Sequence, residues 1–327
     1  MNNNKKYIIG IDIGGTTCKM ALFTMNMKML KKWSIDTDTK NHGKNIIKKC
    51  VASIMLNIAI KDIDKNDIYG IGVAVPGPVL DDAVITKAIN IGWNRPCDIK
   101  KELKKYFLSN TQIKVANDVN AAGLGEYNVI DNKNIKSFVM VSMGTGIGGG
   151  LIYDGKIVAG KNGSAMEIGH IRVDDSYNAK RCNCGSRGCA ETFGGTNHIK
   201  ESFISNLKNK KLYNIKSVFR KYKKEDYKNI DTKEICNAAK KGNKLCILTL
   251  KENMYKVGKM FASLILTLDP DMIVIGGGIS KGGAIITKYI KDGIKDNMKM
   301  IEKIPAIKIS MLKSDAGIYG AGYLVIK

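Results

Sequence analysis

The octapeptide Asp12-Ile13-Gly14-Gly15-Thr16-Thr17-Cys18-Lys19 joins two apolar, β-forming runs, Tyr7–Ile13 and Cys18–Phe23. This pattern predicts a β-hairpin with a tight glycine turn. Glycine lets a backbone approach phosphates closely, and a carboxylate at a strand end can hold hydrated Mg²⁺. Taken alone, the stretch fits an ordinary hairpin turn as well as it fits a phosphate loop.

The same arrangement occurs a second time along the chain. Phe138–Ser142 and Gly149–Tyr153 are β-forming runs that flank the turn Met143-Gly144-Thr145-Gly146. The segment from Gly144 to Gly149 also fits the dinucleotide pattern G-x-G-x-x-G, but that interpretation requires a helix next. The residues that follow alternate like a strand and contain an Asp-Gly turn, and the chain has no Walker A sequence. Two strand-turn-strand copies therefore favour a pair of phosphate-binding hairpins.

Helices and strands elsewhere complete an α/β pattern. Apolar residues at helical spacing predict a helix over 43–60, and buried strands are predicted at Ile68–Val75 and Ile113–Ala116. Asp98 is the expected N-cap of a helix over 99–107. Further along, the predicted elements are a helix at Asn243–Leu268, a strand at Met272–Ile275, an edge strand at Ala306–Met311 and a closing helix at Ala316–Ile326.

The length of the chain bounds its organisation. At 327 residues it is about twice as long as one ordinary domain, so two lobes with a substrate cleft between them are expected. We place an N-terminal lobe at 1–117, joined by a C-terminal helix at 313–327. A C-terminal lobe with a cysteine-rich loop is placed at 118–312.

The composition is strongly basic but argues against nucleic-acid binding. The formal net charge is +23, yet only five of the 53 basic residues are Arg, the residue on which base-edge recognition relies. The lysines are scattered among Asn and Ile, which indicates a compositional bias.

No apolar run is long enough to span a bilayer, and the residues before Tyr7 lack the apolar core of a signal peptide. We expect a cytoplasmic protein that binds neither nucleic acid nor membrane.

Seven motifs are distributed over most of the chain: Ile11–Thr16, Val73–Val79, Asn117–Ala122, the Gly144 turn, Glu167–His170, the cysteine cluster at Cys182–Cys189, and Asp269–Asp271 before Gly276–Gly278. Together they resemble the ROK family of sugar kinases and sugar-responsive repressors, and the resemblance spans most of the chain, from Ile8 to Gly322. It implies an α/β, two-lobed actin-like ATPase (ribonuclease H-like) fold with duplicated β-hairpin phosphate loops.

The resemblance implies an ATP-dependent hexose kinase that uses Mg²⁺. In the family, the carboxylate at the position of Asp118 is the general base. The chemistry agrees, because a sugar hydroxyl is a poor nucleophile and a carboxylate can accept its proton as the γ-phosphoryl group leaves ATP. Asn117-Asp118 could instead cap the following helix, and both roles can coexist. Nucleotide contacts are expected from Asp12, Gly14, Gly15, Thr16, Thr17 and Lys19, from Gly144, Thr145, Gly146 and Gly148, and from Gly277 and Gly278.

Three of the eight cysteines are clustered. Cys182, Cys184 and Cys189 follow His170 at loop-scale separation. Three thiolates and one imidazole suit tetrahedral, structural Zn²⁺, with no ligand position left for water. Random clustering or reactive thiols are the alternatives. A zinc-bound imidazole presents its other nitrogen as an N–H donor, which can hold a sugar hydroxyl.

The resemblance extends to the sugar site. The family uses the equivalent of His170 both for zinc and for the sugar, and the carboxylates at the positions of Glu167 and Glu191 accept hydrogen bonds from neighbouring hydroxyls. Surface acidity is the alternative role for the two glutamates. The pocket is completed by Asn117, Asp118 and the backbone at Gly77, with Asn90 as a weaker candidate. Met166 departs from the family, whose members usually have a small residue, commonly Gly, at this position.

The acceptor and several rival functions stay open. Glucose, giving glucose 6-phosphate and ADP, is the first choice, while N-acetylmannosamine, N-acetylglucosamine, fructose and allose present similar hydroxyls. A sugar-sensing repressor would need a helix-turn-helix, for which the short stretch before Tyr7 leaves no room. A non-catalytic sugar-binding protein would need a lost base or a broken phosphate loop, whereas Asp118 and Asp12 are both present. The resemblance also implies a homodimer. Within the chain, we expect the lysine-rich segment Lys208–Asp226 to be a solvated helical excursion.

Overall fold

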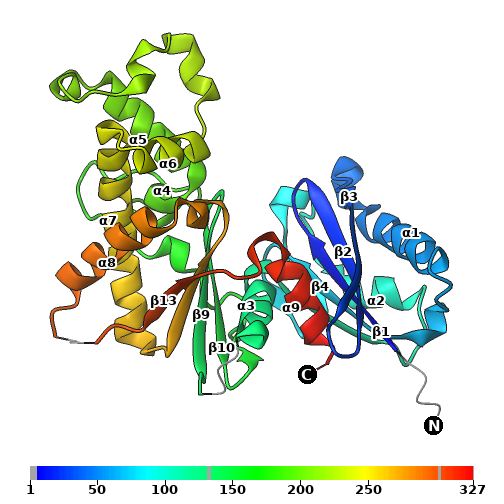
Figure 1. The fold of residues 1–327 in the computed structure, drawn as a ribbon. Helices are drawn as coiled ribbons and strands as arrows, with labels where there is room; N and C mark the ends of the chain where they lie inside the picture. The colour runs from blue at the N-terminus through cyan, green and yellow to red at the C-terminus, as the bar shows by residue number, and fades with distance from the viewer. Residues whose placement is uncertain (1–5, 131–133, 301–302, 327) are drawn as a thin grey trace. The chain divides into compact units, whose positions relative to one another are not determined.

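The structure, a computed structural model, describes residues 6–130, 134–300 and 303–326 (Figure 1). It forms two compact units: the first contains residues up to 140, 150–166 and those from 311 on, and the second contains 141–149 and 167–310. Residues 1–5, which belong to the stretch before Tyr7 that lacks a signal-peptide pattern, lie outside the described residues. Among the described helices, none combines the length and the apolar composition that crossing a membrane requires.

The elements alternate between strands and helices along the chain. The β-strands are β1 (Tyr7–Ile13), β2 (Thr17–Thr24), β3 (Met29–Asp36), β4 (Ile68–Val75), β5 (Val79–Leu80), β6 (Val84–Ile85), β7 (Cys97–Asp98), β8 (Gln112–Asn117), β9 (Ser137–Met143), β10 (Ile147–Tyr153), β11 (Lys156–Ile157), β12 (Met272–Gly276) and β13 (Ala306–Ile309). The α-helices are α1 (Ile46–Ala59), α2 (Ile99–Lys104), α3 (Asp118–Val129), α4 (Glu191–Gly194), α5 (Thr196–Lys208), α6 (Thr232–Lys240), α7 (Lys244–Leu268), α8 (Ala284–Asn297) and α9 (Ala316–Leu324).

The first unit is built on a five-stranded sheet with the order β3-β2-β1-β4-β8. The predicted hairpin is confirmed, because β1 and β2 pair antiparallel with Ile13 opposite Cys18, while β4 lies parallel to both β1 and β8. Helices α1 and α2 cover one face of the sheet and α9 covers the other (Figure 1). Since both faces are covered, β4 is almost continuously apolar, as a central parallel strand must be.

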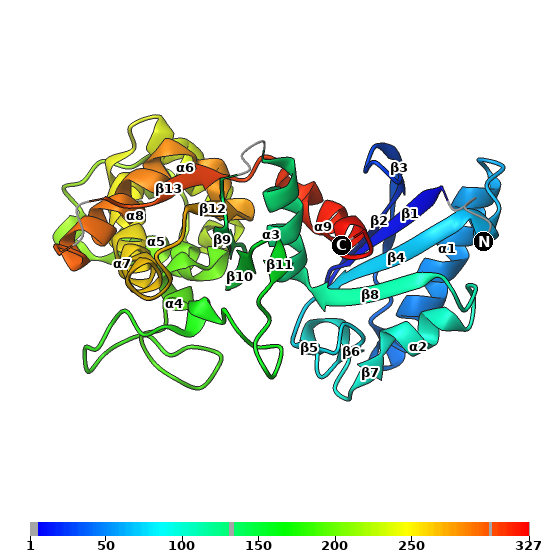
Figure 2. The same cartoon turned by 90° about the horizontal axis from the view of Figure 1, so that it is seen from below.

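Several elements of the first unit differ from the sequence prediction. Strand β3 was not predicted, because half of its residues are exposed and lysines interrupt its apolar pattern, as is usual at a sheet edge. The small sheet β5-β6-β7, beside α2 in Figure 2, is too short to give a periodic signal. Helix α1 begins at Ile46 rather than 43, because Asn41, His42 and Gly43 all have positive φ angles and cannot continue a helix. Asp98 caps α2 as predicted, by accepting the Lys101 N–H at 2.8 Å.

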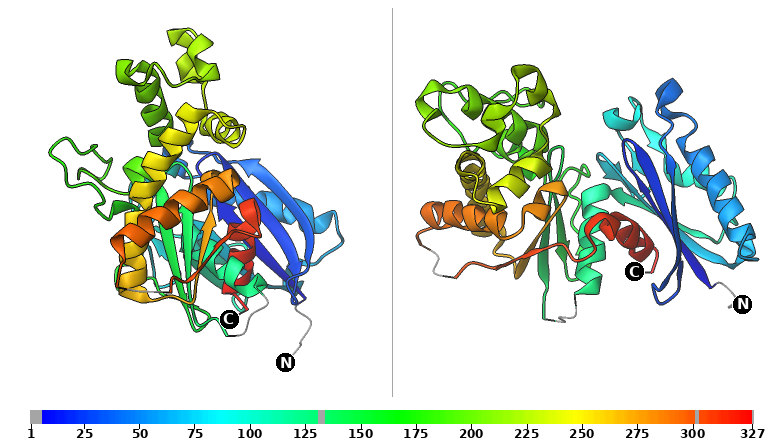
Figure 3. Two further views of the ribbon diagram at one scale, coloured as in Figure 1. Left: turned by 60° about the vertical axis from the view of Figure 1, so that its left-hand side comes forward. Right: turned by 45° about the horizontal axis from the view of Figure 1, so that its top comes forward.

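The second sheet has the order β11-β10-β9-β12-β13, and its strands β9 and β10 run through both units. In the second unit the long helix α7 packs against α8 (Figure 3). Helix α7 ends at Leu268, as the sequence predicted, and its C-cap residue Asp269, which precedes Pro270, has a positive φ. The expected helical excursion after α5 forms only short 3₁₀ turns, at 210–212, 218–221 and 224–229. Its lysines at near-consecutive positions do not supply the apolar stripe that a packed helix needs.

Helix α3 packs tightly against α9, so it lies in the first unit although the lobe boundary predicted at residue 117 places it in the C-terminal lobe. Glycines allow the close approach: a Cβ atom at Gly125 would lie 2.5 Å from the carbonyl oxygen of Ala316. This contact joins segments that are almost two hundred residues apart. No local sequence pattern in either segment predicts this contact.

A carboxylate fastens the same two segments together, and its removal should destabilise the protein. Glu126 on α3 is fully buried and accepts the backbone N–H groups of Met311 at 3.0 Å and Leu312 at 2.9 Å. We expect Glu126→Ala to lower the free energy of unfolding by about 2 to 4 kcal/mol, because two N–H donors lose a charged acceptor. Denaturant titration measures this, and Glu126→Gln, which keeps one acceptor oxygen, should lose less. A loss below about 1 kcal/mol for the alanine variant would contradict the assignment.

Candidate functional site

The first Gly/Thr turn is closed by its own backbone. The Gly14 N–H donates to the carbonyl oxygen of Thr17 at 3.0 Å, and the Thr37 hydroxyl donates to the Gly14 carbonyl oxygen at 2.7 Å. Gly15 and Thr16, at the tip, are exposed. A Cβ atom at Gly15 would lie 3.6 Å from the Asn90 carbonyl oxygen, so the structure brings Asn90 beside this turn. The tip is therefore a backbone surface that a phosphate group can approach.

Carboxylates gather behind this turn, at the end of β1. Burial raises the pKa of Asp12 to about 6, against the opposing effect of the Lys19 ammonium group, and the negative charges of Asp118 and Asp315 raise it further. The Lys19 ammonium group donates to the Ser314 carbonyl oxygen at 2.9 Å, so it is held beside the same residues. A group of carboxylates whose charges repel one another suits a hydrated divalent cation such as Mg²⁺. These residues could hold that ion.

Asp12 should lower the stability of the ligand-free protein at neutral pH. Its pKa rises from 3.8 to about 6 on folding, so folding is favoured below pH 4 and the advantage disappears as pH rises through 6. We expect Asp12→Asn, measured by thermal unfolding at pH 7.5 without nucleotide or Mg²⁺, to raise the midpoint by a few degrees, and the gain to shrink by pH 5. Asp64→Asn, on an exposed turn, is the control. A lower midpoint for Asp12→Asn at pH 7.5 would contradict the raised pKa.

Asn117 and Asp118 stand where β8 ends and α3 begins. The Asn117 side-chain oxygen accepts the backbone N–H groups of Val119 at 2.9 Å and Asn120 at 3.2 Å, and its amide group donates to the Gly77 carbonyl oxygen at 3.2 Å. The capping role considered for this pair therefore belongs to Asn117, which also fixes the Gly77 loop. Asp118 is half-buried and accepts the Val119 N–H at 2.9 Å, so its carboxylate is held at the carboxyl end of the sheet.

The second Gly/Thr turn lies in the second unit and is likewise closed by its own backbone. The Gly144 N–H donates to the Gly146 carbonyl oxygen at 2.9 Å. Gly277, with a φ of 79°, packs directly against the backbone of Met143, so a side chain there would overlap it. Positions Gly144 and Gly278 face open space. The structure thus brings the predicted nucleotide residues of this unit together.

A cavity of about 340 Å³ adjoins Gly278. Its lining also includes Thr196 and Thr232, and the Thr232 hydroxyl donates to the Thr196 carbonyl oxygen at 2.8 Å. The Thr196 N–H donates to the carbonyl oxygen of Gly144 at 2.9 Å, which attaches this wall of the cavity to the second Gly/Thr turn. The sequence analysis missed the walls contributed by α5 and α6, since no Gly-rich or charged motif marks them. It also missed Asp315, which follows an ordinary loop.

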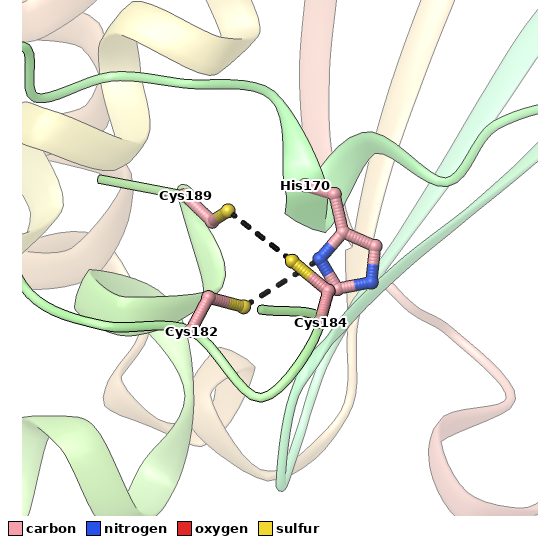
Figure 4. Close-up of side chains that lie close together, drawn as sticks. All are labelled: His170, Cys182, Cys184 and Cys189. Carbon is pink, nitrogen blue, oxygen red and sulfur yellow. Dashed lines mark hydrogen bonds between the residues drawn. The ribbon is translucent and has the colours of Figure 1, made fainter. Parts of the chain in front are cut away.

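Four side chains that could ligate a metal meet in the second unit (Figure 4). The ligand atoms of His170, Cys182, Cys184 and Cys189 all lie within 4.8 Å of one another. The distance from Cys182 Sγ to His170 Nδ1 is 3.7 Å, and that from Cys184 Sγ to Cys189 Sγ is also 3.7 Å. A tetrahedron with zinc–ligand distances of about 2.0 to 2.3 Å has edges of about 3.3 to 3.8 Å, so the set fits this ion.

Only one thiol of this cluster, that of Cys184, has a lowered pKa in the ligand-free protein, since burial raises the pKa of Cys182 as well as that of Cys189. The Ser186 backbone N–H and the Cys182 side chain lower the pKa of Cys184 to about 7, whereas burial and the neighbouring thiols raise the pKa of Cys189 to about 12. Metal ligation requires thiolates. All eight cysteines are free of disulfides in the described residues, which leaves these three available as ligands.

His170 turns Nδ1 toward the sulfur atoms and its other ring nitrogen away from them (Figure 4). The side chain is exposed, as is that of Glu167. Met166 has a φ of 68°, in the left-handed region where glycine is favoured. This conformation explains why a residue without a side chain is usual there in the family that the chain resembles.

Glu191 connects the cysteine cluster to the second Gly/Thr turn. One carboxylate oxygen accepts the Ile147 backbone N–H at 3.1 Å, and the other lies 3.9 Å from Cys182 Sγ. A side chain at Gly146 would overlap this carboxylate. Glu191 is therefore held in place by the turn rather than displayed as surface acidity.

Comparison with known proteins agrees with the sequence motifs. The model of the ROK family matches residues 8–327. A glucokinase from Halalkalibacterium halodurans is 32% identical over 98% of this chain and 95% of its own length, and an N-acetylgalactosamine kinase from a Shewanella species is 28% identical over 96% and 95%. A ROK family glucokinase from Streptomyces griseus, solved with glucose and AMPPNP, superposes with a TM-score of 0.76 at 26% identity, over 97% of this chain and 98% of that one.

Proposed function

This chain belongs to the ROK family and is a sugar phosphotransferase, and we propose that it transfers the γ-phosphoryl group of ATP to a glucose hydroxyl. The predicted actin-like ATPase fold is confirmed by the solved relatives. The product would be glucose 6-phosphate, with ADP released. N-acetylhexosamines and fructose are the alternative acceptors, and N-acetylhexosamine kinases are among the similar proteins.

The observation that carries the proposal is the placement of Asp118. Its carboxylate is held at the end of β8 by the Val119 N–H, while Asn117 takes over the helix cap. It also lies close enough to Asp12 to raise the pKa of that group. A base beside the metal-binding carboxylate and the phosphate turn can accept the proton of the attacking hydroxyl.

We assign the nucleotide contacts by unit. In the second unit, the adenosine would occupy the cavity beside Gly278, with the phosphates on the Gly144 turn. In the first unit, Asp12 would hold Mg²⁺, and the N–H groups around Gly15 would receive phosphate oxygens. Mg²⁺, when bound, neutralises negative charge on the transferred group.

The cluster of His170 and the three cysteines would hold structural Zn²⁺. Nδ1 of His170 would be the ligand atom, and the tautomer would then be fixed, so that Nε2 would carry a proton that can be donated to a sugar hydroxyl. Glu167 and Glu191 would accept hydrogen bonds from neighbouring hydroxyls, and Asn90, Asn117 and the Gly77 backbone would contribute from the first unit.

The assembly and the compartment are also proposed. A homodimer is the assembly that the family resemblance implies. The cytoplasm supplies ATP and keeps thiols reduced, which suits a protein whose three clustered cysteines serve as metal ligands.

A sugar panel tests this function. ADP release would be followed with Mg²⁺·ATP and glucose, mannose, fructose, allose, N-acetylglucosamine or N-acetylmannosamine, for the wild-type protein and for Asp118→Asn. We expect glucose to give the highest kcat/KM, and the variant to lose this turnover. A higher value for an N-acetylhexosamine would change the acceptor and keep the reaction class. No Asp118-dependent turnover with any sugar would refute the kinase.

A further inference from the structure

A second cavity lies in the first unit, between the start of α1 and the segment that leads into α2. Its volume is about 920 Å³, and its lining contains none of the residues assigned above to the sugar, the nucleotide or a metal. One wall comes from 42–48 and the other from 92–106. It is large enough for a small organic molecule.

The cavity is lined by basic side chains without acidic partners. His42, Lys44, Lys48 and Arg95 are all exposed, and within residues 6–130, 134–300 and 303–326 none of them forms an ion pair. The neighbouring Lys49, which is not part of the lining, does pair, with Asp38 at 2.8 Å. Lys48 thus keeps its charge unpaired, whereas its neighbour on α1 does not. An excess of cations in a concave surface attracts an anion.

The two carboxylates in the lining form no ion pair with these basic groups within the described residues. The Asp98 carboxylate accepts the Lys101 N–H at 2.8 Å as the cap of α2. Glu102 pairs with Lys105 at 2.7 Å, on its own helix. Both keep oxygen lone pairs that can accept hydrogen bonds from hydroxyl groups of a ligand.

An aromatic residue forms the base of the cavity. Trp93 is only 6% exposed, and its indole N–H donates to the Gly43 carbonyl oxygen at 3.1 Å. A Cβ atom at Gly43 would lie 2.7 Å from that indole nitrogen and 2.6 Å from the Ile91 carbonyl oxygen, so the two walls are in direct contact there. Tyr106, 38% exposed, adds a second ring. The base can therefore receive the apolar faces of a compact ligand.

The start of α1 adds to the positive potential. The side chain of its N-cap residue, Asn45, makes no capping hydrogen bond, and its first turn has no acidic residue. The first N–H groups of a helix carry partial positive charge. They belong to the same wall as Lys44 and Lys48.

We propose that this cavity binds a small phosphate monoester, with the phosphate held by Lys44, Lys48 and Arg95 and the hydroxyl-bearing body on Trp93 and Tyr106. A phosphate monoester carries nearly two negative charges at neutral pH, which matches several unpaired cations better than one carboxylate does. Inorganic phosphate shares the anionic chemistry but lacks the body. The site stands independently of the acceptor proposed above.

Calorimetric titration of the whole protein with glucose 6-phosphate tests the site, with inorganic phosphate in a second arm. Glucose, a non-hydrolysable ATP analogue and Mg²⁺ are kept saturating so that the catalytic groups are occupied. The test variant carries Lys48→Gln and Arg95→Gln, one change in each wall of the cavity. The control variant carries Lys61→Gln and Lys65→Gln, which remove the same amount of charge from exposed, unpaired positions outside the cavity. We expect the first pair to weaken binding at least about tenfold and the second to leave it unchanged.

Fluorescence locates the ligand, since the chain has only two tryptophans. In a Trp33→Phe background, glucose 6-phosphate should change the Trp93 emission saturably, and potassium chloride of equal ionic strength should not. Equal binding by the wild-type protein and the Lys48/Arg95 variant would overturn the proposal, as would an emission change that chloride reproduces. Inorganic phosphate binding as tightly as the monoester would overturn the part assigned to Trp93 and Tyr106.

Discussion

Asp118→Asn is expected to lower kcat for sugar phosphorylation by about 10²- to 10⁴-fold, the range that general-base assistance contributes. The amide is nearly the same size as the carboxylate but cannot accept the hydroxyl proton. The fold should survive, because Asn117 rather than Asp118 carries most of the cap of α3, with hydrogen bonds to both Val119 and Asn120. KM values for sugar and ATP should change little.

Steady-state kinetics with the best sugar of the panel, together with thermal unfolding, measures this prediction. Asp64→Asn removes one carboxylate from an exposed turn of the same unit and is the matched control, with expected wild-type kcat. A kcat for Asp118→Asn within about threefold of wild type would refute Asp118 as the base. A loss of activity accompanied by unfolding would instead show that Asp118 is structural. The zinc content of the variant distinguishes a local change around Asp118 from loss of the whole fold.

Cys184→Ser is expected to release zinc and to weaken sugar binding without affecting ATP. The Cys184 sulfur lies 3.7 Å from that of Cys189, and Cys184 is the exposed one of the three cysteines. Changes to residues that merely support metal ligands cost about 10- to 100-fold in metal affinity, so the loss of a ligand should exceed about 100-fold. His170 would then no longer be fixed in one tautomer, and the sugar KM should rise about tenfold, the equivalent of one hydrogen bond.

Metal analysis by mass spectrometry and the two KM values measure these effects. Cys97→Ser, which removes a half-buried thiol from the first unit, should retain about one zinc per chain and wild-type kinetics. Chelation of the wild-type protein should reproduce the Cys184→Ser kinetics, and zinc should restore only the wild type. An unchanged sugar KM in zinc-free protein would mean that the metal does not orient His170.

Local sequence was sufficient for the elements whose apolar pattern is long or whose turn chemistry is strict. Strand β4 was predicted with its observed bounds, Ile68–Val75, because it is buried on both faces. The hairpin at Gly14 and its copy at Gly144 follow from paired glycines between β-forming runs. Strand β3 and the sheet β5-β6-β7 were missed because an edge strand and two-residue strands need no continuous apolar pattern.

The candidate site divides in the same way. Asp12, Asn117-Asp118 and the four residues of the Cys/His cluster were predicted because each belongs to a short motif whose chemistry depends on spacing in the sequence. Asp315, the cavity walls on α5 and α6, and the contact of Glu191 with the Gly146 turn were not found. Each of them depends on segments that are distant in the chain and meet only after folding.

The sequence by itself determined the two Gly/Thr hairpins, and it predicted the carboxylate proposed as the base and the Cys/His set proposed as metal ligands, because these depend on residue type, on local spacing and on short motifs that resemble the family. Only the tertiary structure decided that Asp12 has a raised pKa, that Glu126 holds α3 to the chain before α9, and that unpaired cations line one cavity together with Trp93. The physical reason is that burial, electrostatic coupling and cavities are properties of surfaces brought together by packing. Local sequence specifies the side chains on each helix and strand, whereas packing determines which of those side chains come into contact.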